Sequence, residues 1–226
     1  MTDPQSNGFS KELVTILNPA SVASEAYRIL RTNLFYAQVD SPPKVVVLTS
    51  AGPGEGKTTT VANLGVTLAQ ADKNTLILDC DLRNSRLHRM FGAHNTKGLV
   101  DILMGANKVQ EVWQEPVPGL KLICAGPPPP YPAELLSSQR LVEFLGETRR
   151  VFDYVLVDTP PVGVSESAVL AANGDAVLLI LDAQRTPKGS LQRALHSLQG
   201  VGANVLGTLM NKAEVSTNGH LNGNDS

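Results

Sequence analysis

Several absences narrow the classes of protein that this sequence can represent. It has two cysteines, Cys80 and Cys124, and both lie in apolar stretches that resemble strands. Buried, reduced thiols are the expected interpretation over a disulfide or a metal-binding pair, and this favours a reducing compartment. No run approaches the ~20 apolar residues of a membrane-spanning helix, and the first residues lack the basic and apolar regions of a secretory signal. We therefore expect a cytoplasmic protein.

The sequence also lacks an excess of charge of either sign. Its 19 Lys and Arg residues stand against 21 Asp and Glu residues, which gives a formal net charge of −2. A general attraction to nucleic acid or to an acidic membrane surface needs a clear positive excess, and none is present. We expect no nucleic-acid partner, and any partner must be recognised through local contacts.

What the sequence does contain is a series of short apolar runs with stretches of helical periodicity between them. The expected strands cover residues 45–48, 75–78, 120–123, 154–157, 176–181 and 205–209. The expected helices cover residues 25–36, 58–71, 133–150 and 188–199. Such runs predict an α/β fold of three layers with a doubly wound, mainly parallel sheet. Functional residues should then gather at the carboxyl ends of the strands.

The length is ordinary for a single domain, and the two ends differ in composition from the middle. Residues 1–16 are interpreted as a flexible segment, 17–212 as one folded domain, and 213–226, rich in Asn and Gly, as a disordered tail. The proline-rich residues 126–132 fit either a rigid connector at a strand end or a ligand for an SH3-type domain, and the connector is favoured.

A glycine-rich loop follows the first expected strand and leads into a helix. The candidate nucleotide-binding residues in it are Gly52, Pro53, Gly54, Glu55, Gly56, Lys57, Thr58 and Thr59. In a P-loop, backbone N–H groups close around phosphate oxygens, the lysine reaches the β- and γ-phosphates, and the hydroxyl after it binds Mg²⁺. Ala51 departs from the strict pattern, which has glycine there. The loop predicts ATP or ADP with Mg²⁺ as ligands.

Acidic residues end two further strands. Asp79 and Asp81 follow one apolar run and share a face of the extended chain, and Asp158 follows another. One carboxylate of the pair can activate a hydroxyl nucleophile while the other holds Mg²⁺. Asp79 is the candidate for activation, with Asp81 and Asp158 joining Thr58 at the metal, although these roles can be exchanged. Together with Lys57 these carboxylates form the candidate catalytic set.

These motifs resemble those of the bacterial tyrosine autokinases of capsule and exopolysaccharide synthesis, which are relatives of the MinD and ParA group of P-loop ATPases. The resemblance covers residues 17–212, with Walker A at 50–59, Walker A-prime at 76–83 and Walker B at 155–161. Partition ATPases carry a lysine where Gly52 stands here. The resemblance therefore implies an Mg²⁺-dependent protein tyrosine kinase that transfers a γ-phosphoryl group. A MinD- or ParA-like assembly switch and a non-catalytic nucleotide-binding module are the alternatives.

Further residues acquire roles through the same resemblance. Asn211 lies where related ATPases contact adenine, although an Asn after a strand is also common in turns. Arg83, next to the acidic pair, is a candidate phosphate or subunit contact, whereas His88 and Arg89 are expected in a solvated loop.

The helix before the first strand resembles the E-x-x-R-x-x-R element that joins such kinases into rings. Its residues here are Glu25, Arg28 and Arg31, and a solvated charged face explains the same spacing. The family also works with a membrane polysaccharide co-polymerase or export protein. A partner of this kind would recruit the chain to the inner face of the plasma membrane.

The resemblance breaks at the tyrosines. Family members carry several in a flexible tail that enters the neighbouring subunit, but residues 213–226 contain none. The four tyrosines are Tyr27, Tyr36, Tyr131 and Tyr154, of which Tyr36 and Tyr131 are the candidate acceptors. Three explanations remain open: a shortened tail, an acceptor in another protein, or ATP hydrolysis without autophosphorylation.

Overall fold

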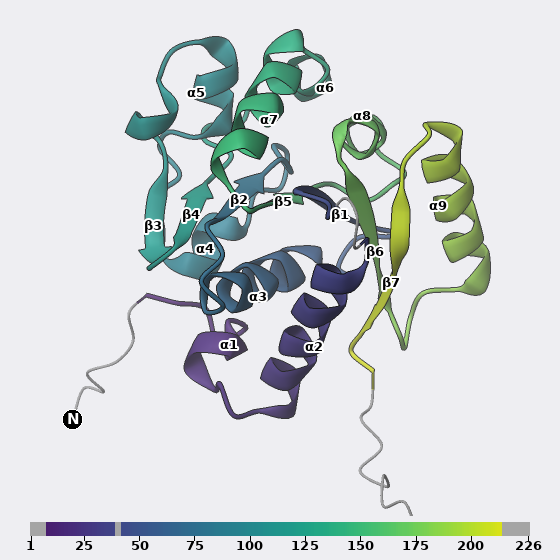
Figure 1. Ribbon diagram of the computed structural model, residues 1–226. Coiled ribbons are helices and arrows are strands. Elements are labelled where there is room, and N and C mark those ends of the chain that lie inside the picture. The colour runs from purple at the N-terminus through teal and green to yellow at the C-terminus, as the bar shows by residue number, and fades with distance from the viewer. Residues whose placement is uncertain (1–7, 39–41, 214–226) are drawn as a thin grey trace, which may run out of the picture.

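The computed structural model describes residues 8–38 and 42–213, and in these residues seven strands form one sheet (Figure 1). The strand order is β3-β4-β2-β5-β1-β6-β7. The strands are β1 (Val45–Ser50), β2 (Thr75–Asp79), β3 (Gln114–Val117), β4 (Leu120–Ile123), β5 (Tyr154–Asp158), β6 (Ala176–Asp182) and β7 (Val205–Asn211). Every neighbouring pair is parallel except β3 with β4. The expected doubly wound, mainly parallel sheet is confirmed.

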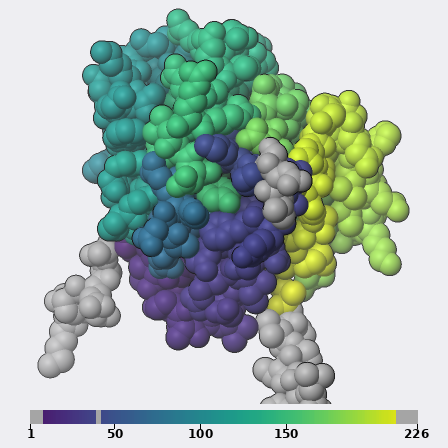
Figure 2. Space-filling view, in the orientation of Figure 1, coloured from purple at the N-terminus to yellow at the C-terminus, as the bar shows by residue number. Residues whose placement is uncertain are grey.

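Helices cover both faces of this sheet. They are α1 (Val14–Leu17), α2 (Val22–Tyr36), α3 (Lys57–Ala69), α4 (Leu87–Phe91), α5 (Leu99–Met104), α6 (Pro132–Leu136), α7 (Gln139–Val151), α8 (Ser165–Asn173) and α9 (Lys188–Gly200), with a 3-10 turn at Val109–Glu111. Alternate residues of β1 enter different cores: Val45 and Val47 pack towards α7, α8 and α9, whereas Val46 and Leu48 pack towards α2 and α3. β7 and α9 form one side of the molecule, at the right in Figures 1 and 2. The sheet and the helices on its two faces thus form three layers.

The structure corrects several expected elements. The single helix expected over 133–150 is two helices, because the hydroxyls of Ser137 and Ser138 bond to backbone carbonyls at the break. β3 was not predicted, since it is short and contains Pro116, which is tolerated at a sheet edge. α4, α5 and α8 were also missed. α4 includes His88 and Arg89, which were expected in a loop.

The N-terminal segment packs against the domain earlier than expected. Leu13 is fully buried, the Ser10 N–H donates to Met90 O at 3.0 Å, and the Asn63 side chain donates to Glu12 O at 2.8 Å. The packed part therefore begins before residue 17. The expectations for residues 1–7 and 214–226 lie outside the described residues. Within 8–38 and 42–213, no helix combines the length and apolar character that crossing a membrane requires.

Candidate functional site

The carboxyl ends of the central strands bring the sequence motifs to one edge of the sheet. Leu48 of β1 is paired in register with Asp158 of β5, and Asp158 is paired with Asp79 of β2. The P-loop continues from the end of β1 into α3. The P-loop and both acidic strand ends thus meet where the parallel sheet was expected to hold its functional residues.

The P-loop backbone is shaped by glycines in the left-handed region. Gly54 has φ 74° and Gly56 has φ 96°, a region that residues with a Cβ rarely enter. Inside the loop, the Gly52 N–H donates to Glu55 Oε2 at 3.0 Å. This conformation turns the chain into α3, so the amino terminus of a 13-residue helix faces the loop.

Lys57 is buried at the start of α3 and points back along the loop. Its Nζ donates to Ser50 Oγ at 2.9 Å, and Ser50 Oγ donates to Gly52 O at 2.6 Å. Burial lowers the pKa of Lys57, and the nearby carboxylates of Asp158 and Asp81 oppose this change. The ammonium group is thus held in place by a neutral hydroxyl, which an anionic ligand can replace.

Thr58 and Asp158 form the closest polar contact between the P-loop helix and β5. Thr58 Oγ1 donates to Asp158 Oδ2 at 2.6 Å, and Asp158 Oδ1 is buried with no hydrogen-bond partner among the described residues. Burial and the neighbouring Asp79 raise the pKa of Asp158 well above its usual range, against the effect of Thr58 and Lys57. A divalent cation would supply the missing partner and favour the charged carboxylate, so the donor set fits Mg²⁺.

Asp79 and Asp81 lie in different environments despite their spacing. Asp79 is fully buried, and its Oδ2 accepts from Ser85 Oγ at 2.7 Å and from Leu87 N at 3.3 Å. Burial raises the pKa of Asp79 to about 6, against the effect of the hydrogen bonds from Ser85 and Leu87. Asp81 is partly exposed, and its Oδ1 caps the following turn at Asn84 N. Asp81 is therefore the more accessible of the two.

Arg83 makes an ion pair within the chain, beside the phosphate or subunit contact expected for it. Its Nε lies 2.8 Å from Oε1 of Glu166 in the first turn of α8, and the Glu166 side chain is 1% exposed. The pair fastens the loop after β2 to α8. Breaking it would leave a buried carboxylate without its cation, which is costly.

A clamp on the P-loop was missed by sequence reasoning. Asn211 Nδ2 donates to Glu55 O at 2.9 Å, and Lys212 Nζ donates to Gly54 O at 2.9 Å and to Asp182 Oδ2 at 2.7 Å. The Asn211 amide thus contacts the P-loop backbone. This role is separate from the adenine contact and the turn role expected from the sequence. More than 150 residues separate Asn211 from Glu55 and Lys212 from Gly54, so no local pattern could have joined them.

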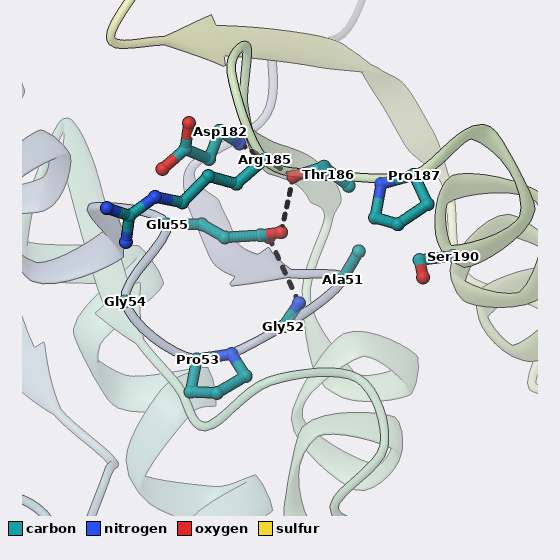
Figure 3. Close-up of a pocket in the computed structure, with 10 residues that line it drawn as sticks. All are labelled: Ala51, Gly52, Pro53, Gly54, Glu55, Asp182, Arg185, Thr186, Pro187 and Ser190. Carbon is teal, nitrogen blue, oxygen red and sulfur yellow. Dashed lines mark hydrogen bonds between the residues drawn. The ribbon is translucent and has the colours of Figure 1, made fainter.

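The loop after β6 completes this clamp. Thr186 Oγ1 donates to Glu55 Oε1 at 2.5 Å, so the Glu55 carboxylate bridges Thr186 and the Gly52 N–H (Figure 3). A pocket of about 250 Å³ lies beside it. Its lining residues are Ala51, Gly52, Pro53, Gly54, Glu55, Asp182, Arg185, Thr186, Pro187 and Ser190. The P-loop conformation therefore depends on β6, β7 and their loops.

The E-x-x-R-x-x-R residues lie on α2 and make contacts within the chain. Arg28 forms an ion pair with Glu25 at 2.7 Å and donates to Pro19 O at 2.9 Å. Arg31 Nη1 donates to Thr67 O of α3 at 3.0 Å. Arg31 thus has a role inside the chain that its spacing did not reveal.

Comparisons with known proteins identify the family. A protein-family model described as "AAA domain" matches residues 43–209. The tyrosine-protein kinase YwqD of Bacillus subtilis is 37% identical over 208 residues, covering 91% of this chain and 88% of YwqD. The putative tyrosine-protein kinase CapB of Staphylococcus aureus is 32% identical, covering 88% and 89%. EpsB of Ralstonia solanacearum is longer, and the 39% identical match spans 27% of it.

Solved structures with a similar fold indicate the same family as these relatives. The chimerical protein CapA2B2 superposes with a TM-score of 0.85 at 30% identity, covering 90% of this chain and 91% of that one. The kinase domain of the Escherichia coli tyrosine kinase ETK superposes with a TM-score of 0.84 at 31% identity, covering 90% and 82%. MinD of Pyrococcus horikoshii, at 21% identity and a TM-score of 0.64, shares the fold. The chain belongs to the bacterial tyrosine-protein kinases.

Proposed function

We propose that the chain is an Mg²⁺-dependent tyrosine kinase of the autokinase type that uses ATP and acts in polysaccharide synthesis or export. The observation that carries this proposal is the contact of Thr58 with Asp158, whose buried Oδ1 has no hydrogen-bond partner within the part of the chain that the structure describes. This contact lies at the end of the P-loop, and Asp158 is paired in register with Asp79. The family supports tyrosine as the acceptor class.

The residues of the site have separate roles in in-line phosphoryl transfer. The backbone N–H groups of residue 52 and of residues 54–59 would hold the phosphates, and Lys57 would exchange Ser50 for the β- and γ-phosphate oxygens. Thr58, Asp158 and Asp81 would hold Mg²⁺, which neutralises charge on these phosphates when bound. Asn211 keeps the loop in the shape that binds them.

We propose Asp79 as the group that accepts the proton of the tyrosine hydroxyl. Asp79→Asn is expected to lower the rate of phosphoryl transfer by ~10²-fold or more while nucleotide affinity changes little, because general-base catalysis contributes this much. One side-chain oxygen remains to accept the bonds of Ser85 and Leu87.

The matched variant is Asp81→Asn, which should instead weaken Mg²⁺ binding and raise the Mg²⁺ concentration needed for half-maximal activity. Steady-state kinetics at several Mg²⁺ concentrations, beside calorimetric titration with ADP, separate the two effects. Full activity of Asp79→Asn would remove this role, and an exchange of the two phenotypes would exchange the roles.

The two alternatives predict different products. ATP turnover and phosphorylation of a Glu–Tyr copolymer should be measured together on the purified chain with Mg²⁺. Phosphotyrosine on the copolymer is the expected result. Turnover without phosphotyrosine would indicate an assembly switch, and tight nucleotide binding without turnover would indicate a non-catalytic module.

We further propose that the chain self-associates through α2, with Glu25 and Arg28 at the contact. Val22, Ile29 and Tyr36 support this, because they repeat every seven residues on one helix face and are 63%, 53% and 72% exposed. Sedimentation of Glu25→Ala/Arg28→Ala should give a lower oligomer mass with little change in melting temperature, since an exposed ion pair adds only ~0.2–1 kcal/mol to folding and the Arg28 bond to Pro19 O is exposed as well.

The control for this experiment removes another exposed ion pair. Glu115→Ala, which loses the contact with Lys121 on β4, should leave the oligomer mass unchanged. Arg31 is unsuitable for this test because its bond to Thr67 O belongs to the fold. A double variant with the mass of the unchanged protein would dismiss the α2 interface.

We also propose a membrane polysaccharide co-polymerase or export protein as partner, which places the chain in the cytoplasm at the inner face of the plasma membrane. The family resemblance supports this proposal. EpsB and the tyrosine-protein kinase wzc of Salmonella typhimurium are longer proteins, and the chain spans 27% and 28% of them. Fractionated cells should yield the chain with the membranes, and recovery only in the soluble fraction would contradict the proposal.

A further inference from the structure

Only two of the chain's tyrosines offer an accessible hydroxyl. Tyr154 is 6% exposed at the start of β5, where its ring stacks on Phe35. Tyr27 is partly buried, and desolvation raises its pKa. Tyr36 and Tyr131 are 72% and 68% exposed. Among residues 1–226, a kinase that phosphorylates its own chain therefore has these two accessible hydroxyls to use.

Tyr36 lies at the edge of the sheet opposite the P-loop. It follows Phe35, whose ring centroid is 5.7 Å from that of Tyr154. Tyr154 is the first residue of β5 and Asp158 the last, so the two ends of this strand are ~13 Å apart at ~3.3 Å per residue. Tyr36 also belongs to the α2 face proposed for self-association, which would cover it.

Tyr131 belongs to the same edge as the candidate site. β4 is parallel to β2, and its last paired residue, Ile123, is in register with Leu78, directly before Asp79. The chain then runs through residues 124–131 to α6. α6 packs against α8, whose Glu166 holds Arg83 from the loop after Asp79 and Asp81. A continuous set of contacts thus joins the α6 region to the acidic strand end.

The backbone on both sides of Tyr131 is fixed while its side chain projects outward. The Gly126 N–H donates to Asn95 Oδ1 at 2.8 Å, and Pro132 is buried at the first position of α6. The Tyr131 carbonyl accepts from Leu135 N at 3.2 Å, whereas its hydroxyl has no hydrogen bond within residues 8–38 and 42–213. The phenol is presented on a rigid connector.

We propose that Tyr131 is the phosphate acceptor of this chain and that a second copy phosphorylates it. This inference rests on the proposed kinase function. The Tyr131 hydroxyl oxygen forms a bond to the γ-phosphorus of ATP, and the bond from that phosphorus to the β,γ-bridging oxygen breaks. ADP leaves, and the phenolic proton passes to the carboxylate that acts as base in the second copy.

The position of Tyr131 favours transfer between chains. β4 and β1, which precede Tyr131 and the P-loop, are three strand spacings apart in the sheet, or ~14 Å at ~4.8 Å each. The Tyr131 side chain is 68% exposed and is not among the residues that line the pocket beside the P-loop. A second copy can instead bring its own P-loop to the exposed phenol.

The test mixes a kinase and an acceptor. Full-length Tyr131→Phe serves as the kinase, and full-length Lys57→Met, which we expect to be inactive, serves as the acceptor. After incubation with ATP and Mg²⁺, mass spectrometry should find phosphate on the peptide with Tyr131, which only the acceptor contains. Lys57→Met/Tyr131→Phe should lose this signal as acceptor, and Lys57→Met/Tyr36→Phe should retain it. The rate per kinase should rise with acceptor concentration.

A Glu–Tyr copolymer added to Tyr131→Phe distinguishes the kinase function from the assignment of Tyr131 as acceptor. Phosphorylation of the copolymer together with phosphate on Tyr131 of the acceptor supports both the kinase function and this assignment. Phosphorylation of the copolymer while the acceptor carries phosphate on Tyr36, or none, overturns the assignment of Tyr131 and leaves the kinase function intact. A copolymer that is not phosphorylated by this variant or by the unchanged protein overturns the kinase function itself.

Discussion

Lys57→Met is expected to reduce phosphoryl transfer by ~10²- to 10³-fold, because a preorganised charge at the transferring group is worth this much in a site shielded from water. The ammonium group lies at the start of α3 and contacts Ser50 Oγ at 2.9 Å, a bond that phosphate oxygens can replace. Methionine has a similar length and no charge. Nucleotide affinity should fall as well, since Lys57 contacts the bound phosphates before and during transfer.

The fold should survive this substitution, because burial already disfavours the charged form of Lys57 and an apolar side chain suits the position. Copolymer phosphorylation and ADP titration measure the effect, and the melting temperature verifies folding. Lys44→Met, at an exposed lysine that bonds to Arg149 O, is the control. A Lys57→Met protein with the activity of this control would refute the assignment of the P-loop.

Gly56→Ala is expected to abolish tight nucleotide binding through geometry instead of charge. A Cβ at Gly56 would lie 1.9 Å from Asn211 Nδ2, and the φ of 96° is unfavourable for any residue with a side chain. Asn211 would have to move and lose its bond to Glu55 O. Strain of ~2 kcal/mol alone, if borne by the binding-competent loop, corresponds to a roughly 30-fold loss of affinity.

Gly54→Ala provides the control, because Gly54 also has a positive φ of 74° but nothing lies within 4 Å of its Cβ position. It should bind ADP more tightly than Gly56→Ala. Adding Asn211→Gly to Gly56→Ala removes the clashing amide and should recover part of the affinity in calorimetry. Equal binding by the two alanine variants would mean that the contact with Asn211 has no influence on the loop.

The sequence predicts those parts of the site whose residues lie in short, local patterns. Gly56 and Lys57 are adjacent at a strand-to-helix turn, and Asp79 and Asp158 each end an apolar strand. Parallel strands with helical crossovers then bring these ends to one edge. The same reasoning gives the central strands and the longest helices, because hydrophobic periodicity is strong there.

The parts that could not be predicted depend on partners far apart in the chain or on weak local preference. Asp182, Thr186 and Lys212 join the P-loop only after β6 and β7 are placed beside β1. Arg31 looked like a surface residue because its partner, Thr67 O, is a backbone atom on another helix. Short elements such as β3 have too few residues for a period to be recognised.

The destination of the γ-phosphate of ATP tests the central claim most directly. The purified chain should be incubated with ATP labelled in this group, with Mg²⁺ or with EDTA, and the label on tyrosine compared with the label released as free phosphate. We predict label on tyrosine that requires Mg²⁺ and is lost in Lys57→Met. Label that appears only as free phosphate, under conditions in which Mg²⁺ supports turnover, would contradict the claim that this site is a tyrosine kinase.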